Sequence, residues 1–202
     1  MSTASLILAA QKHFPNLKVV MKTDSNFMKI LSTLMFFNKG FMTKFTTTIG
    51  STIYAPSQEW LDKNNPVLIH EIIHLYDEKR LGFLYNLLYL FPQILIIPTL
   101  LLLLFFNWHW ILPVAGVCLL PLPALGRSYF EKRAYLVQLF VYINLYNSNE
   151  AVTGANLAKY FKNSTYYWMH PWQADLTLAE AKAQIAADKN LQSLVDDLIK
   201  SI

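Results

Sequence analysis

Residues 65–80 read NPVLIHEIIHLYDEKR, a stretch in which two histidines and a glutamate stand in an otherwise apolar helical pattern. An asparagine followed by proline is typical of a helix start, with the proline at the first helical position. Residues four apart share one face of a helix, so His70 and His74 can direct both imidazoles at one metal ion. Glu71 lies on a neighbouring face, where its carboxylate can take a proton from water. The stretch therefore predicts a metal-dependent hydrolytic site on a helix.

The ligand types favour zinc, because imidazole and carboxylate groups without a thiolate suit this ion. A catalytic zinc needs a third protein ligand. Asp77 could ligate, but a second-shell hydrogen bond to a histidine suits its short side chain better. Glu131 is the stronger candidate, since it lies on a charged turn of an otherwise apolar helix, expected over residues 127–146, directly after the uncharged block. The alternative for Glu131 is an exposed carboxylate paired with Arg127, Lys132 or Arg133.

A long uncharged block separates the two ligand segments. From Leu81 to Gly126 there is no Asp, Glu, Lys or Arg, and the whole chain is 54% hydrophobic and only 15% charged. Residues 83–106 are long enough to span a bilayer, which needs roughly 20 apolar residues, whereas residues 111–126 are shorter and contain three prolines. We expect an inserted apolar helical hairpin, residues 83–125, to be transmembrane. Aromatic residues that could mark the membrane interfaces are Tyr85, Tyr89, Trp108 and Trp110. The alternative is a hairpin buried in the core of a soluble protein.

The charges beside the hairpin predict its orientation. Basic residues precede it at Lys79 and Arg80 and follow it at Arg127, so both ligand helices are expected on the cytoplasmic side of a membrane. The N-terminus has no basic region before its short apolar run, and we expect no signal peptide. The net charge of +4 comes from scattered residues, which argues against nucleic acid as a partner. A single cysteine, Cys118, excludes an intrachain disulfide.

The rest of the chain predicts an α+β fold. Residues 17–22 and 44–56 are rich in β-branched side chains and indicate strands, the second interrupted at Gly50. Residues 27–37 have helical apolar spacing and suggest a core helix. A C-terminal amphipathic helical tail, residues 174–202, begins with a capping box formed by Thr177 and Glu180, and Asp188 can start a second short helix.

An HExxH helix followed by a glutamate on a later helix resembles the gluzincin zinc metallopeptidases. The segment RSYFEKRA, residues 127–134, resembles the R-x-x-x-E-x-x-A stretch of the membrane-bound HtpX and CAAX prenyl protease group. The resemblance implies a minimal zincin-like domain over residues 1–202, a small sheet plus active-site helices, with the hairpin inserted. It implies His70, His74 and Glu131 as metal ligands and Glu71 as general base. It also implies a substrate-holding strand beside the active-site helix, for which FTTTIGSTIY is the candidate.

A peptidase also needs a group that stabilises the oxyanion. His170 and Tyr167 lie in the aromatic loop NSTYYWMHPWQ, residues 163–173, and are the expected candidates together with Tyr166. Tyr135, one turn after Glu131, is a further candidate.

These observations lead to one functional hypothesis and two alternatives. The hypothesis is a membrane-associated zinc metallopeptidase that acts on a peptide or protein substrate, with the lipid bilayer as its other partner. The first alternative is a membrane-anchoring or membrane-active structural protein whose zincin domain is vestigial or purely structural. The second is a soluble peptidase whose hairpin is core or docks on a partner.

Overall fold

The structure is a computed structural model that describes residues 3–34, 38–95, 98–99, 101, 113, 124–162 and 175–201. Helices account for 73% of these residues and strands for 7%. The elements in chain order are α1 (Thr3–His13), β1 (Lys18–Met21), the 3₁₀ turn η1 (Lys22–Asp24), α2 (Asn26–Leu34), β2 (Thr47–Ile49), β3 (Thr52–Ala55), α3 (Gln58–Lys63), α4 (Asn65–Leu81), α5 (Phe83–Leu90), the 3₁₀ turn η2 (Gln93–Leu95), α8 (Leu125–Tyr146), α9 (Glu150–Lys162), α10 (Leu178–Ala186) and α11 (Lys189–Ser201).

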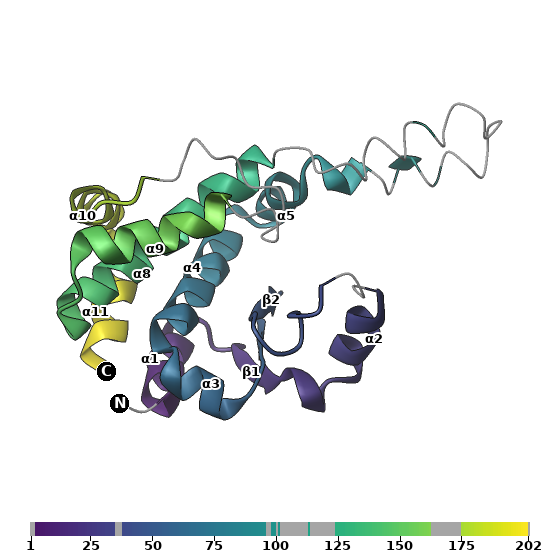
Figure 1. Ribbon diagram of the computed structural model, residues 1–202, viewed down its shortest axis with the longest axis horizontal. Coiled ribbons are helices and arrows are strands. Elements are labelled where there is room, and N and C mark those ends of the chain that lie inside the picture. The colour runs from purple at the N-terminus through teal and green to yellow at the C-terminus, as the bar shows by residue number, and fades with distance from the viewer. Residues whose placement is uncertain are drawn as a thin grey trace.

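Helix α4 lies at the centre of the molecule, with the sheet on one side and α8, α9 and α11 on the other (Figure 1). It packs most extensively against α8, and its residues from Leu68 to Leu75 are all buried. A helix with apolar side chains on nearly every face is stable only when it is covered all round. The main core joins α4 and α8 to α1, α10 and α11 through buried Leu, Ile, Val and Ala side chains.

The sheet contains three strands in the order β1-β3-β2, with β1 parallel and β2 antiparallel to β3. The strands β2 and β3 form a hairpin whose two-residue loop starts at Gly50, with a φ of 54°. Such a φ suits glycine, which explains why the predicted break falls at this residue. The order leaves β2 at an edge of the sheet, next to α4.

The predicted fold class, a zincin-like α+β domain with a transmembrane hairpin, is wrong. Both predicted strand regions are present, but each strand has only three or four residues, and they do not form a layer that could cover the helices. The core is instead built by packing helices on helices. The described part of the chain is therefore mostly helical, with a small mixed sheet at one side.

The apolar run from residue 83 does not form one long helix. Helix α5 ends at Leu90 because Pro92 lacks the N–H that a continuing helix needs, and the turn η2 follows. Among the described residues, no helix is both long enough and apolar enough to cross a membrane. The second apolar run, residues 111–126, lies mostly outside the described residues, as do Trp108, Trp110 and Cys118.

Two further expectations can be compared with the structure. Helix α2 is not a core helix, because Met28 is its one buried residue among the described side chains, while Phe27 and Ile30 are 52% and 64% exposed. The C-terminal segment forms the two expected helices, and the Thr177 side chain accepts a hydrogen bond from the Glu180 N–H, as the capping box predicts. Both helices contribute to the core rather than trailing from it.

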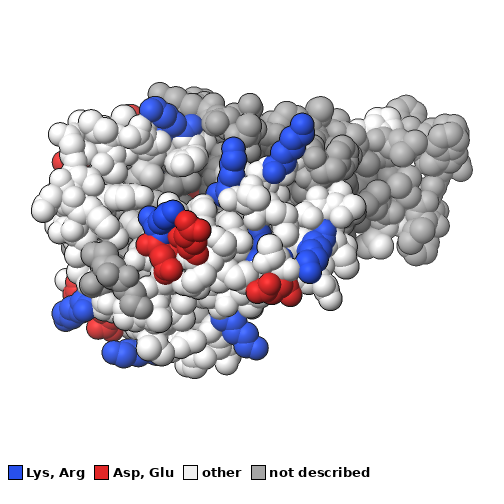
Figure 2. Space-filling view, turned by 60° about the horizontal axis from the view of Figure 1, so that its bottom comes forward, with Lys and Arg blue, Asp and Glu red and all other residues white. Residues whose placement is uncertain are grey.

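The charged side chains that Figure 2 shows on one face lie singly or in mixed-sign groups, separated by uncharged residues. This view contains no continuous basic stripe.

Candidate metal centre

The two histidines of HEIIH lie side by side on one face of α4. The His70 and His74 Nε2 atoms are 3.1 Å apart, and the exposed fractions of the two residues are 3% and 5%. Helix α4 begins at Asn65, with Asn64 as its N-cap. Pro66 is therefore its second residue, and not the first as predicted. The four-residue spacing and the buried helix together direct both imidazoles to one point.

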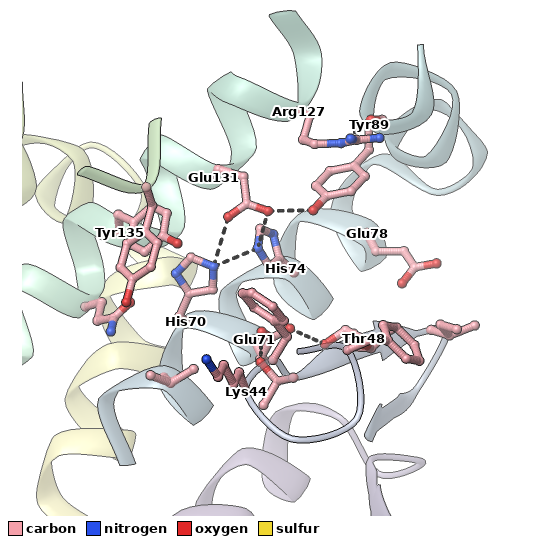
Figure 3. A pocket seen from close by; sticks show the side chains of 18 of the residues that line it. Lys44, Thr48, His70, Glu71, His74, Glu78, Tyr89, Arg127, Glu131 and Tyr135 are labelled. Carbon is pink, nitrogen blue, oxygen red and sulfur yellow. Dashed lines mark hydrogen bonds and ion pairs between the residues drawn. The ribbon is translucent and has the colours of Figure 1, made fainter. Parts of the chain in front are cut away.

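Glu131, from α8, faces the same point (Figure 3). Its Oε2 lies 3.1 Å from His70 Nε2, and its Oε1 lies 3.5 Å from His74 Nε2. Glu131 is only 2% exposed, so it is not the solvated surface carboxylate that the alternative required. Its basic neighbours have other partners, since Lys132 pairs with Glu180 and Arg133 with Asp77.

The three side chains fit a metal ion better than they fit one another. Tetrahedral bonds of about 2.0–2.1 Å separate ligand atoms by about 3.3 Å. The two Nε2 atoms are 3.1 Å apart, and each has a different Glu131 oxygen close by, Oε2 at 3.1 Å from His70 and Oε1 at 3.5 Å from His74. Hydrogen bonds alone leave a conflict, because two protonated Nε2 atoms repel each other and an unprotonated Nε2 repels the carboxylate. A cation between the two Nε2 atoms and the Glu131 carboxylate would remove both conflicts. The buried His70, His74 and Glu131 group can therefore hold a metal ion.

The pKa values of Glu131 and His74 also indicate a site that favours a positive charge. Burial alone would raise the pKa of Glu131, but the charge of His74 and hydrogen bonds from both histidines hold that pKa well below its usual value. Burial alone would lower the pKa of His74, but the Glu131 carboxylate raises it to about 9. Without a metal, a proton on His74 balances the Glu131 charge, and a bound cation would replace that proton.

Two tyrosines of α5 support the group. The Tyr85 hydroxyl lies 3.2 Å from His74 Nδ1, where it can accept from Nδ1–H when Nε2 faces an ion. The Tyr89 hydroxyl donates to Glu131 Oε1 over 2.5 Å. From the sequence these two tyrosines could mark a membrane interface, whereas in the structure Tyr85 is buried and both line the cavity beside His70, His74 and Glu131. Their spacing of four residues was the available signal, since it places both on one helix face.

Asp77 does not make the predicted hydrogen bond to a histidine. Its two carboxylate oxygens accept from Arg133 Nε at 2.9 and 3.1 Å, which ties α4 to α8 close to the ligands. The described residues give His70 Nδ1 no hydrogen-bond partner. Asp77 therefore acts on the arrangement of the two ligand helices rather than on a ring nitrogen.

Glu71 is held by the strand beside the helix. The hydroxyls of Thr46 and Thr48 donate to its two carboxylate oxygens, the latter over 2.5 Å. Both threonines lie in the segment that was expected to hold a substrate, although their role towards Glu71 was not predicted. Thr46 and Thr48 are two residues apart, so in an extended segment both side chains point the same way. This spacing could have suggested that they act together on Glu71.

One cavity of about 700 Å³ connects these groups. Its lining includes His70, Glu71, His74 and Glu131, residues 44–50 of the edge strand and its approach, and aromatic residues of α5, α8 and α9. Tyr135 lines it too, with its ring centroid 4.4 Å from that of His70 and its ring stacked on Tyr160. The cavity therefore gives the metal group and Glu71 a common space for a ligand.

The other predicted oxyanion candidates, His170, Tyr167 and Tyr166, lie outside the described residues.

Comparisons with known protein families, with characterised proteins and with solved structures find no match for this chain.

Proposed function

We propose that the protein is a zinc-dependent metallopeptidase in which His70, His74 and Glu131 hold the ion and Glu71 is the general base. The observation that carries the proposal is that one cavity contains both a three-ligand metal group and a separate carboxylate from the same helix. A catalytic metal site needs a free position for water or substrate, whereas a structural zinc site has four protein ligands. Among the described residues three ligands converge, which favours a catalytic over a structural site.

Zinc is the proposed ion because the donor set is two imidazoles and one carboxylate. A zinc ion in this position would polarise a peptide carbonyl and lower the pKa of a water molecule, which hydrolysis at neutral pH requires. The ligand set is also that of the gluzincins, which the sequence resembles.

Glu71 performs the proton transfers in the proposed reaction. It takes a proton from the water that attacks the carbonyl and delivers it to the leaving amine. Thr46 and Thr48 fix the orientation of its carboxylate, and one of these hydrogen bonds gives way to the water when the substrate is bound.

Strand β2 is the proposed binding site for the peptide backbone. Residues Thr47–Ile49 line the cavity and lie at an edge of the sheet, where a bound peptide can add as a further strand. An extended peptide at this edge would pass over Glu71, because Thr48 contacts that carboxylate directly.

The first test measures zinc by inductively coupled plasma mass spectrometry and the cleavage of unfolded fluorescent casein. We expect about one zinc per chain in the wild type. Glu71→Gln should retain zinc and lose about 10²–10⁴-fold in cleavage rate, the usual contribution of a general base. Glu59→Gln, an exposed substitution on α3, is the matched control and should match the wild type. Full activity of Glu71→Gln would refute the mechanism, and zinc without any cleavage would favour a structural site.

A further inference from the structure

Tyr89 has a position at the metal group that no other described tyrosine shares. Its hydroxyl is 2.5 Å from Glu131 Oε1, so it reaches the ligand oxygens on the side of the cavity away from Glu71 (Figure 3). The Tyr89 hydroxyl is the donor in this contact, because a carboxylate oxygen accepts. A donor at this place lies beside the position proposed for the ion. There the carbonyl oxygen of a bound peptide would develop negative charge in the proposed reaction.

Arg127 holds Tyr89 in this position. Its Nε donates to the Tyr89 backbone oxygen over 3.2 Å, and its guanidinium carbon lies 5.1 Å from the centroid of the Tyr89 ring. The Tyr85 ring also stacks on Tyr89, with centroids 5.4 Å apart. A donor that is fixed before the reaction contributes most to catalysis, because no reorganisation is needed when the charge develops.

The two other tyrosines near the histidines are less suited to this role. The Tyr85 hydroxyl contacts His74 Nδ1, the ring nitrogen turned away from the metal group. Tyr135 contacts His70 through its ring and stacks on Tyr160. The Tyr89 hydroxyl, unlike that of Tyr85, contacts a ligand oxygen directly.

We propose that Tyr89 is a catalytic residue that donates a hydrogen bond to the carbonyl oxygen as this oxygen becomes negative. The inference rests on the proposed peptidase function. Without an ion, the Tyr89 hydroxyl donates its hydrogen bond to Glu131. With a cation held by Glu131, its oxygens would be weaker acceptors, and the Tyr89 hydroxyl would donate its hydrogen bond to the more basic oxyanion instead. The new bond exists only in the transition state, so it accelerates the reaction.

The test compares Tyr89→Phe with Tyr85→Phe, and uses Tyr129→Phe, on the exposed side of α8, as the matched control. Three quantities are measured on each zinc-loaded protein: zinc affinity by competition with a chelating dye, casein cleavage at saturating zinc, and the Kd of acetohydroxamate by calorimetry. Acetohydroxamate is the probe because it places a carbonyl oxygen on a protein-bound zinc ion without being cleaved.

We expect Tyr89→Phe to lose about 10²–10³-fold in kcat at saturating zinc, the usual effect of removing one oxyanion donor. Its acetohydroxamate Kd should rise about tenfold, which corresponds to one lost hydrogen bond. Tyr85→Phe should weaken zinc binding by about 10–100-fold, as loss of an outer-shell partner does, and saturating zinc should restore its cleavage rate. Tyr129→Phe should behave as the wild type.

The results separate this inference from the proposed function. If Tyr89→Phe regains wild-type kcat and acetohydroxamate affinity at saturating zinc, Tyr89 only supports Glu131 and the inference is wrong. If the wild type binds zinc without cleaving casein, the peptidase proposal fails by itself. A tenfold loss of acetohydroxamate affinity confined to Tyr89→Phe would still support Tyr89 as the donor to a carbonyl oxygen at this ion.

Discussion

Two buried polar contacts join α4 to α8, and they differ in what completes them. Asp77 and Arg133 carry opposite charges, and Arg133 Nε donates to both carboxylate oxygens, so the two charges balance without an added ion. Glu131 instead faces two imidazoles that repel each other or the carboxylate unless a proton or a cation lies between them. The same pair of helices therefore contains one contact that serves stability and another that becomes complete on binding an ion.

The pKa shifts of the two carboxyl groups express this difference. Burial raises the pKa of Asp77, and the charge of Arg133 opposes that effect only in part. Burial also acts to raise the pKa of Glu131, but the charge of His74 and the imidazole hydrogen bonds overcome it, and the pKa falls well below its usual value. The surroundings of Glu131 therefore favour an ionised carboxylate, whereas burial at Asp77 favours the protonated form.

Breaking the structural pair should have the largest effect on stability. Arg133→Met leaves the Asp77 carboxylate buried without its partner, which typically costs about 3–5 kcal/mol. Because the unpaired carboxyl group can escape the cost by taking up a proton, the loss should be larger at pH 8 than at pH 5. Denaturant unfolding at both pH values measures it.

The double variant Asp77→Leu/Arg133→Met is the control, since it removes both charges and should recover most of the lost stability. If the single and double variants are equally unstable, the cost comes from packing of Arg133 and not from an unpaired charge.

Zinc should stabilise only the second contact. At a free zinc concentration 100 times Kd, the wild type should gain about 2.7 kcal/mol, or about 5–10 °C in Tm for a chain of this size. Glu131→Gln removes one ligand and should abolish most of this gain, whereas Arg133→Met should retain it from a lower starting Tm. Differential scanning fluorimetry with and without zinc provides the measurement. An equal zinc response in Glu131→Gln would exclude Glu131 as a ligand.

The pH should affect the metal contact through His74, whose pKa rises from 6.5 to about 9 in the folded, metal-free protein. A raised pKa stabilises the folded state fully below about pH 6.5, and the stabilisation is lost as pH rises to 9. Zinc must displace the His74 proton, so its affinity should rise with pH by up to tenfold per unit until about pH 9.

Calorimetry in buffers of different ionisation enthalpy should therefore detect about one proton released per zinc near pH 7. The metal-free Glu131→Gln variant should lose the decline in stability between pH 6.5 and 9. A zinc affinity that is independent of pH in this range would contradict a protonated His74.

The sequence was sufficient for those parts of the site that depend on local spacing. The four-residue separation of His70 and His74 follows from helix geometry, and Glu131 was identifiable as the one carboxylate in an apolar helix. The strand break at Gly50 and the N-cap at Thr177 are also local, and both are present.

The roles of Tyr85 and Tyr89 could not be predicted because they depend on how α5 packs against α8. This packing is close at Gly126, where an added Cβ would lie 2.2 Å from the Leu88 carbonyl oxygen. An apolar composition around the two tyrosines fits a membrane interface equally well from sequence alone. The fold class was wrong for a similar reason, since strand patterns reveal where strands lie but not whether they are long enough to form a layer.

The smallest effect on stability is expected at Lys132. This residue stands between Glu131 and Arg133 in α8, so it allows an exposed ion pair to be compared with the two buried contacts. Its Nζ lies 2.7 Å from Glu180 Oε1, but the two side chains are 24% and 43% exposed. Water and salt screen such a pair, so Lys132→Met should cost only about 0.2–1 kcal/mol and less still in 1 M salt. Denaturant unfolding at low and high salt measures this loss, with the Arg133→Met loss expected to change little because Asp77 is buried. If Lys132→Met lowered the free energy of unfolding as much as Arg133→Met does, burial would not decide which contacts of α8 stabilise the fold.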